Sequence, residues 1–376
     1  MRRPDAGAAA VIAAVLLLSA CGAPEPAPSA TTAGPGPTST LAPSASPTAS
    51  AGSLPQTPET VVDGLEAPWS IAFAEGSALV SERDSGRVLE LVSGGTRVVA
   101  TIDGVRHGGE GGLLGLAVRD GALYVYSTAD DGNRVERYPL RGGPGSWALG
   151  DPAPIIDGLP AAGNHNAGRI AFGPDGMLYV PVGDAGESAR AQDPDSLNGK
   201  ILRLTPDGSV PADNPFSGSP VYSLGHRNVQ GLAWDEDGRL IASEFGQNTW
   251  DELNVIEPGG NYGWPVVEGS ASGGDYIDPI AQWPTREASP SGIAVVDEFV
   301  VIANLRGEVL RSVSIDDPDE ETLDSFAGEY GRLRDVVVAP DGALWILTNN
   351  TDGRGDPRTG DDRILRLSPA AVDPDD

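Results

Sequence analysis

A short pattern recurs six times along the chain and limits the folds that it can adopt. Each copy has a brief apolar strand, in most copies an Asp- and Gly-rich turn, and then a second apolar strand. An Asp-Gly pair between apolar runs predicts a hairpin, because glycine adopts the positive φ angles that tight turns need. The six first strands are 69–73, 114–118, 169–172, 231–234, 292–295 and 335–338.

A third strand recurs later in each unit, and the repeats start about 43 to 62 residues apart. Blades of four strands suit that period, and no helical periodicity of useful length is present. We therefore predict an all-β fold, a six-bladed β-propeller of four-stranded antiparallel blades, whose last blade is completed by a strand near residues 60–62. The six third strands are 88–91, 135–138, 201–204, 253–256, 309–312 and 364–367.

The start of the chain predicts export. Arg2 and Arg3 precede an apolar run, 8–18, that is too short to span a bilayer and ends at small residues before Cys21. We expect residues 1–20 to be a lipoprotein signal peptide and Cys21 to be acylated. The protein would then lie on the extracytoplasmic side of the cell envelope, touching the membrane through its lipid anchor only. The alternative is that this single cysteine is a buried apolar thiol.

Composition divides the remaining chain. Residues 21–58 are almost wholly Ala, Pro, Ser, Thr and Gly, which predicts a disordered linker. Residues 59–370 form one propeller domain in this interpretation, and 371–376 are an acidic tail. The net charge of −29 argues against nucleic acid and anionic membrane surfaces as partners.

Two loops that precede inner strands carry candidate catalytic groups. His165, one of three histidines, stands before the third inner strand, where a neutral imidazole could take a proton from a substrate hydroxyl. The alternative is a loop histidine bonded to backbone. Arg227 and Asn228 occupy the equivalent loop before the fourth strand and add a guanidinium and an amide.

Other polar groups gather in the later units. Residues 244–254 and 259–265 are rich in carboxylates and loop carbonyls, which are the oxygen ligands that calcium prefers. Arg306, Arg332 and Arg334 could clamp a multiply anionic ligand, although each alone could be a surface charge.

From about residue 66 to 367 the sequence resembles the glucose/sorbosone dehydrogenases, which include soluble quinoprotein glucose dehydrogenases and aldose sugar dehydrogenases dependent on pyrroloquinoline quinone (PQQ). The segments that carry the resemblance are 110–115, 163–169, 224–228, 251–254, 261–265 and 332–335.

The resemblance implies an enzyme that oxidises an aldose at its C1 hydroxyl to the lactone, with hydride transfer to PQQ. His165 would be the general base, and Arg227 would stabilise negative charge on the reduced cofactor. The electrons would pass to an acceptor in the cell envelope. The cofactor-binding residues implied are Glu110, Arg227, Asn228, Arg306, Arg332 and Arg334.

The resemblance also implies calcium. The backbone carbonyls of Gly246 and Gln247 would hold one ion near the cofactor, and a second would involve Glu252 and the carbonyl of Tyr262. On the sugar side the resemblance implies Asn164 and Trp283.

Several positions depart from the glucose dehydrogenases. Glu110 replaces Gln, Asn164 replaces Asp, Arg306 replaces Lys, Gln247 replaces Pro, and Ile280 stands where an aromatic residue is expected. The identity of the sugar therefore stays open. Two alternatives stay open as well, a non-catalytic propeller that binds a glycan or protein, and a calcium-dependent lactonase.

Overall fold

The computed structural model describes residues 57–271, 274–318, 320 and 322–368. The signal peptide, Cys21, most of the linker and the acidic tail lie outside these residues, so the predictions for them stay predictions. Within the described part, no helix is long and apolar enough to cross a membrane.

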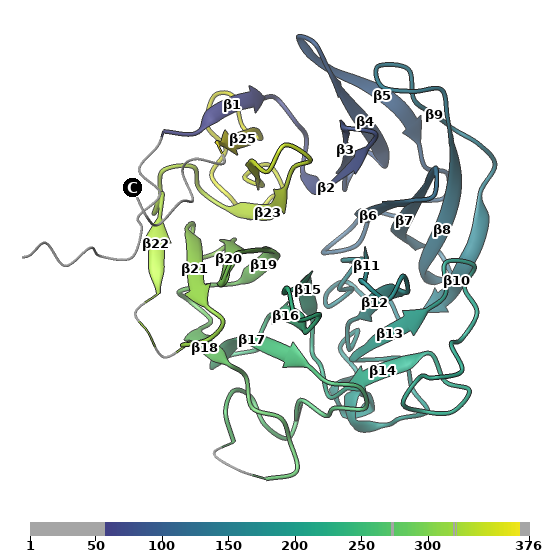
Figure 1. Ribbon diagram of the computed structural model, residues 1–376, viewed down its shortest axis with the longest axis vertical. Coiled ribbons are helices and arrows are strands. Elements are labelled where there is room, and N and C mark those ends of the chain that lie inside the picture. Colours follow the sequence, from purple (N-terminus) through teal and green to yellow (C-terminus); the bar gives the residue numbers. More distant parts are fainter. Residues whose placement is uncertain (1–56, 272–273, 319, 321, 369–376) are drawn as a thin grey trace, which may run out of the picture. The chain divides into compact units, whose positions relative to one another are not determined.

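The described residues form 25 strands and one short 3₁₀ helix, η1 (Ser188–Gln192). The strands make six antiparallel sheets that surround a common axis as six blades (Figure 1). The predicted all-β six-bladed propeller is confirmed.

The first three blades follow one another along the chain. Blade 1 contains β2 (Pro68–Ala74), β3 (Ser77–Glu82), β4 (Arg87–Val92) and β5 (Gly95–Thr101). Blade 2 contains β6 (Leu113–Arg119), β7 (Ala122–Ala129), β8 (Gly132–Arg141) and β10 (Ala153–Leu159), with β9 (Ala148–Leu149) paired to β8. Blade 3 contains β11 (Ala171–Phe172), β12 (Leu178–Val182), β13 (Lys200–Leu204) and β14 (Val221–Leu224).

The last three blades complete the ring. Blade 4 contains β15 (Val229–Trp234), β16 (Leu240–Glu244), β17 (Trp250–Ile256) and β18 (Ala281–Pro284). Blade 5 contains β19 (Pro290–Val296), β20 (Phe299–Asn304), β21 (Leu310–Ser314) and β22 (Leu323–Ser325). Blade 6 contains β23 (Leu333–Val338), β24 (Leu344–Thr348), β25 (Ile364–Leu367) and β1 (Glu59–Val62).

Blade 6 closes the ring with strands from both ends of the domain. β1 pairs antiparallel with β25, with Glu59 opposite Arg366 and Thr60 opposite Leu365. This pairing confirms the prediction that a strand near residues 60–62 completes the last blade. Opening the ring would expose two sheet edges, which is why the junction stabilises the whole fold.

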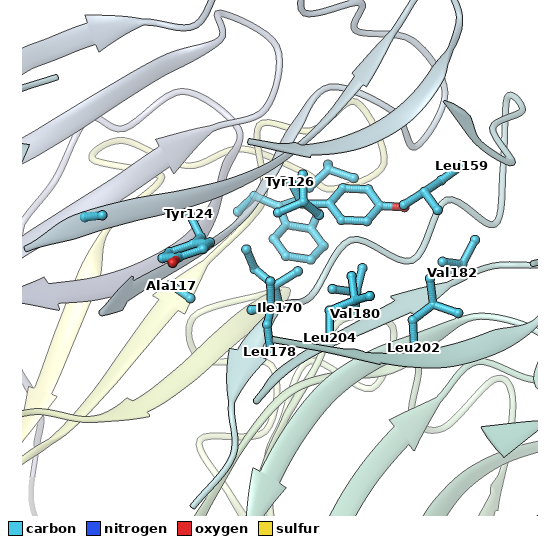
Figure 2. Packing of buried hydrophobic residues seen from close by; sticks show 14 of the residues in the cluster. Ala117, Tyr124, Tyr126, Leu159, Ile170, Leu178, Val180, Val182, Leu202 and Leu204 are labelled. Atoms are coloured by element: carbon cyan, nitrogen blue, oxygen red, sulfur yellow. The ribbon is translucent and has the colours of Figure 1, made fainter. Parts of the chain in front are cut away.

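Apolar side chains fill the space between neighbouring blades. Between blades 2 and 3, Tyr124 and Tyr126 of β7 lie beside Leu178 and Val180 of β12 and Leu202 of β13 (Figure 2). β12 and β13 are buried along their whole length, as strands covered on both faces are. Each large side chain buried in this way contributes roughly 1.5–3 kcal/mol of hydrophobic stabilisation.

The third inner strand is shorter than predicted. The sequence indicated 169–172, but β11 spans only Ala171–Phe172. Just before it, His165 and Ala167 have φ angles of 55° and 53°, and this left-handed backbone cannot continue a ladder. Arg169 then turns its side chain to Gln230 and Asp335 in the interior.

Candidate functional site

One end of the propeller axis collects loops from every blade. Each inner strand begins there and its antiparallel neighbour ends there, so the loops before inner strands and after second strands converge; we call this end the upper mouth. A cavity of about 320 Å³ lies in it. It is lined by Trp69, Glu110, Ala167, Gln230, Phe245, Ser289, Leu305, Arg306, Arg332, Arg334 and Arg354.

His165 lies on the loop that leads into β11, beside this cavity. Its backbone N–H donates to Oε2 of Glu110 at 2.7 Å, which helps to hold the strained φ of 55°. Its ring Nδ1 lies 2.6 Å from Oδ1 of Asp184, and Nδ2 of Asn164 lies 3.0 Å from Nε2. The ring is therefore fixed at both nitrogens. Asn164 lies beside the ring, and its predicted contact with the sugar stays a prediction.

Asp184 orients this imidazole. Its Oδ1 also accepts the Gly186 N–H at 2.8 Å, and its Oδ2 accepts the Trp264 Nε1–H at 2.9 Å. Burial alone would raise the pKa of Asp184, but hydrogen bonds from His165 and Gly186 prevail and hold that pKa below its usual value. An ionised Asp184 favours the tautomer with the proton on Nδ1, which leaves a lone pair on Nε2.

Sequence reasoning missed Asp184. The signal was weak, a carboxylate two positions after the apolar strand 178–182, in a turn with a glycine on each side. Its partner lies 19 residues earlier in the chain, and only the pairing of β11 with β12 brings the two loops together.

Arg227 and Asn228 stand next to the His165 loop, as the equivalent positions of their two loops predicted. Burial lowers the pKa of Arg227, which donates from Nη1 to the Phe245 carbonyl at 3.1 Å and lies 5.5 Å from the Trp264 ring centre. Asn228 is fully buried and accepts the Ala167 N–H at 2.9 Å. Its amide therefore braces the His165 loop from the next blade.

Three arginines form the opposite side of the cavity, on blades 5 and 6. Arg334 is buried and donates to Gln230 Oε1 at 3.0 Å and Ser291 Oγ at 3.1 Å. Burial lowers the pKa of Arg334 to about 9, which leaves it charged at neutral pH. Arg332 pairs with Asp352 at 3.3 Å, and Arg306 is exposed. Among the described residues the Nε atoms of Arg332 and Arg334 have no partner.

A buried ion pair closes the channel below the cavity. Nη1 of Arg169 lies 2.9 Å from Oδ2 of Asp335, and both residues are buried. The guanidinium carbons of Arg169 and Arg334 lie 4.4 Å and 5.1 Å from the centre of the Trp69 ring. A second cavity, of about 310 Å³, lies beyond this pair and is lined by the inner strands. The upper cavity therefore has a solid floor.

The other two histidines have different surroundings. His226 is buried, bonds Ser223 Oγ at 2.8 Å and Glu244 Oε2 at 2.9 Å, and stacks on Tyr262. Its role is to support the Arg227 loop. His107 is exposed.

The loop of Gly246 and Gln247 follows β16 at the upper mouth. Oε1 of Glu268 accepts the N–H groups of Gln247, Asn248 and Thr249 at 2.6, 2.8 and 3.0 Å. No hydrogen bond to the Gly246 or Gln247 carbonyl is found within the described part of the chain. These two oxygens are therefore free to bind a cation.

Glu252 lies deeper, opposite Glu244 in the β16–β17 ladder. It accepts the Gly269 N–H at 2.7 Å, and burial together with Glu244 raises its pKa to about 7. The Tyr262 hydroxyl donates a hydrogen bond to the Val255 carbonyl at 2.7 Å. Among the described residues, no three His, Cys, Asp or Glu side chains converge as a metal centre, so any metal here would depend on carbonyl oxygens.

Trp283 does not line the cavity. It is buried in the apolar core of blades 4 and 5, and the Arg311 guanidinium lies 5.2 Å from its ring centre. Ile280 packs against the same core. Trp283 thus has a structural explanation, and the contact with sugar that the sequence indicated stays a prediction.

Solved structures with this fold and similar sequences are sugar dehydrogenases. A PQQ-bound aldose sugar dehydrogenase of Streptomyces coelicolor is 48% identical, with a TM-score of 0.79 over 82% of this chain and 96% of that one. A glucose dehydrogenase-type oxidoreductase of Thermus thermophilus is 43% identical, with a TM-score of 0.76 over 83% and 99%.

Sequence comparisons agree. The aldose sugar dehydrogenase of Escherichia coli K12 is 29% identical over 354 residues, which are 83% of this chain and 92% of the relative. Residues 65–365 match the family described as glucose/sorbosone dehydrogenase. The match covers most of the chain and confirms the predicted resemblance. The chain belongs to the glucose/sorbosone dehydrogenase family.

Proposed function

We propose that the protein is a PQQ-dependent dehydrogenase that oxidises an aldose at its C1 hydroxyl to the lactone. The observation that carries the proposal is the pairing of His165 with Asp184 beside a cavity that is lined by several arginines, among them Arg306, Arg332 and Arg334. Family membership and the PQQ bound by the Streptomyces coelicolor relative support it.

The residues present fit PQQ, a flat molecule with three carboxylates. Arg306, Arg332 and Arg334 supply matching positive charge, and the only carboxylate in the lining is Glu110. The unpartnered Nε atoms of Arg332 and Arg334 indicate that these side chains have donors to spare among the described residues. Phe245 adds an aromatic side chain to the lining.

His165 would act on the sugar as a general base. When bound, PQQ supplies the acceptor for the hydride that leaves C1. Nε2 of His165 would take the proton of the C1 hydroxyl, in the position where the exposed Asn164 amide now approaches it. Asp184 would stabilise the imidazolium that forms. General-base catalysis of this kind contributes typically about 10²–10⁴-fold to the rate.

Arg227 and Asn228 lie on the same side of the cavity as His165 and Asp184, which we call the reacting side. Arg227 is half-buried with carboxylates nearby, and its charge would stabilise negative charge that develops on the reduced cofactor. Asn228, held by the Ala167 N–H, would place its amide next to the cofactor while keeping the His165 loop in position.

Calcium is a further part of the proposal. The free carbonyls of Gly246 and Gln247 would hold one ion beside the cofactor, and Glu252 with the Tyr262 carbonyl would bind a second. We expect chelation with EGTA to weaken PQQ binding at least tenfold and added Ca²⁺ to restore it. PQQ binding that is unchanged by EGTA would contradict the first ion.

We also propose that Cys21 is acylated, that the protein is anchored outside the cell membrane, and that an envelope carrier takes the electrons. The motif before Cys21 supports this proposal. Metabolic labelling with a clickable fatty acid should mark the wild type and not the Cys21→Ser variant. Equal labelling of both would contradict it.

Reconstitution tests the proposed reaction. The purified protein is loaded with Ca²⁺ and PQQ, and dye reduction is followed with a panel of aldoses. Oxidation that requires both PQQ and a sugar supports the proposal. Failure to bind PQQ, or to oxidise any aldose, would sink it, and lactone hydrolysis with Ca²⁺ alone would support the lactonase alternative.

A further inference from the structure

A fourth arginine, which sequence reasoning did not single out, lies at the rim of the upper cavity. Arg354 is on the loop between β24 and β25, and its side chain is 49% exposed. Its Nη1 donates to Oε1 of Glu110 at 3.2 Å, which joins blade 6 to the loop before blade 2. Both residues line the cavity.

Arg354 is held in this position by its own loop. Asp352 accepts the Arg354 N–H at 2.9 Å through one carboxylate oxygen and pairs with Arg332 through the other. The Asp352 carbonyl also accepts Nη2 of Arg83 at 3.2 Å. Arg354 and Arg332 are therefore both held by Asp352.

Glu110 places the pair next to the reacting side. The same carboxylate accepts the backbone N–H of His165 at 2.7 Å and lies 3.4 Å from Nδ2 of Asn228. A sugar whose C1 hydroxyl reaches His165 would therefore lie next to the loop that Glu110 holds, with the half-exposed Arg354 paired to Glu110 at the rim.

Charge balance gives this pair a specific effect. Among the residues that line the cavity, Arg306, Arg332 and Arg334 match the three carboxylates of the cofactor, which leaves Glu110 and Arg354 as an ion pair at the rim. We propose that Arg354, through its pair with Glu110, is a specificity-determining residue that keeps the rim neutral and so selects neutral aldoses over charged ones. This inference rests on the proposed function.

The glucose dehydrogenases that the sequence resembles have Gln where this chain has Glu110. Replacing the carboxylate alone would leave Arg354 uncompensated and add one positive charge beside the sugar. Replacing Arg354 alone would leave Glu110 uncompensated and add one negative charge. The two changes must therefore shift specificity in opposite directions.

Three sugars that differ only at C6 test the inference, namely glucose, glucuronate and 6-amino-6-deoxyglucose. In the reconstituted protein, kcat/KM for each is measured in the wild type, Glu110→Gln, Arg354→Gln and the double variant. Gln at 110 still accepts the His165 N–H, and the readout is a ratio between sugars, which a general loss of activity does not move.

We expect Glu110→Gln to raise the glucuronate-to-glucose ratio about tenfold and Arg354→Gln to lower it by a similar factor, with the amino sugar changing oppositely. The double variant should return both ratios close to wild type, and added salt should shrink every shift. Arg358→Gln is the control, because Arg358 lies on the same loop but bonds the Gly328 and Glu329 carbonyls away from the cavity.

Ratios that stay within twofold of wild type in both single variants, while PQQ-dependent oxidation persists, would overturn the inference and leave the proposed function intact. Shifts of the same sign in both variants would also overturn it. Absence of any PQQ-dependent oxidation by the wild type would contradict the proposed function itself.

Discussion

The His165–Asp184 pair and the arginines around the upper cavity differ in how completely their polar groups are bonded. On the reacting side, His165 and Asp184 have partners at each of their polar side-chain atoms. In contrast, Arg332 and Arg334 on the arginine side, and Arg227 next to His165, keep Nε atoms without partners among the described residues, and burial lowers the pKa of Arg227 and of Arg334.

The difference reflects two tasks, since the base must be held in position before the substrate binds, whereas the arginines bind the cofactor. A base must be held in one tautomer and one orientation before the substrate arrives, so its hydrogen bonds are already made. Arginines that bind an anion keep positive charge that is not compensated until the anion is bound, and such buried charge lowers the free energy of unfolding of the unliganded protein. Changes to His165 or Asp184 should therefore reduce the rate, and changes to Arg332 or Arg334 should reduce cofactor affinity.

The largest effect is expected at the base. His165→Asn should lower kcat about 10²–10⁴-fold and leave the Kd for PQQ within twofold of wild type, because the imidazole acts on the sugar proton. Steady-state dye reduction and PQQ titration measure the two quantities. His107→Asn, which changes an exposed histidine, is the matched control and should be silent. Full activity of His165→Asn would contradict the assignment.

A somewhat smaller loss is expected at Asp184. The Asn side chain in Asp184→Asn has the same shape as Asp but can donate an N–H to Nδ1 of His165. This favours the tautomer with the proton on Nε2, which can no longer accept the substrate proton. We predict a decrease in kcat of about 10²–10³-fold with little change in PQQ affinity. If Asp184→Asn lost PQQ binding instead, the carboxylate would belong to the cofactor site rather than to the base.

The arginine side should respond in the opposite way. Arg334→Met should weaken PQQ binding about 10²-fold while raising the unfolding free energy of the PQQ-free protein by about 1 kcal/mol, because a buried charge with a depressed pKa is removed. Isothermal titration and urea denaturation measure these changes. A destabilised variant with normal PQQ affinity would show that Arg334 is a structural residue.

The smallest effect concerns pH and the loop that carries Asp184. Lys200 is buried and donates to the Arg190, Ala191 and Asn198 carbonyls at 3.0, 2.9 and 2.7 Å, and burial lowers its pKa to about 8. Between about pH 8 and 10.5 the unfolded chain binds more protons than the folded one, so the stability contribution of Lys200 rises with pH.

Urea denaturation across this range should show the free energy of unfolding of the wild type rising, relative to that of Lys200→Met, by at most about 1.4 kcal/mol per pH unit. The variant serves as the reference that removes tyrosine titration from the comparison. A difference that stays flat from pH 8 to 10 would mean that Lys200 keeps its ordinary pKa in the fold.

The repeat in the sequence predicted the blades well because each blade depends on local hairpins. For example, β4, β8 and β25 contain the predicted third strands 88–91, 135–138 and 364–367, and β1 closes the ring as expected. The exception is β11, where the left-handed backbone at His165 and Ala167 serves the site at the expense of the ladder.

The site was less predictable because its contacts join distant loops. Of the residues taken from the resemblance, Glu110, Arg306, Arg332 and Arg334 line the cavity, and Trp283 does not. Asp184 and Arg354 carried no motif, since their importance comes from partners 19 and 244 positions away. The sequence identified the residues that the family resemblance names, whereas residues that hold them in place, such as Asp184, became evident only from the contacts in the structure.

Titration of PQQ into the Ca²⁺-loaded wild type, His165→Asn and Arg334→Met, followed by absorbance and then by addition of an aldose, tests the division of the cavity most directly. We predict that His165→Asn binds PQQ as tightly as wild type but is not reduced by sugar, and that Arg334→Met fails to bind at concentrations that saturate the wild type. Tight binding by Arg334→Met, or rapid reduction in His165→Asn, would contradict it.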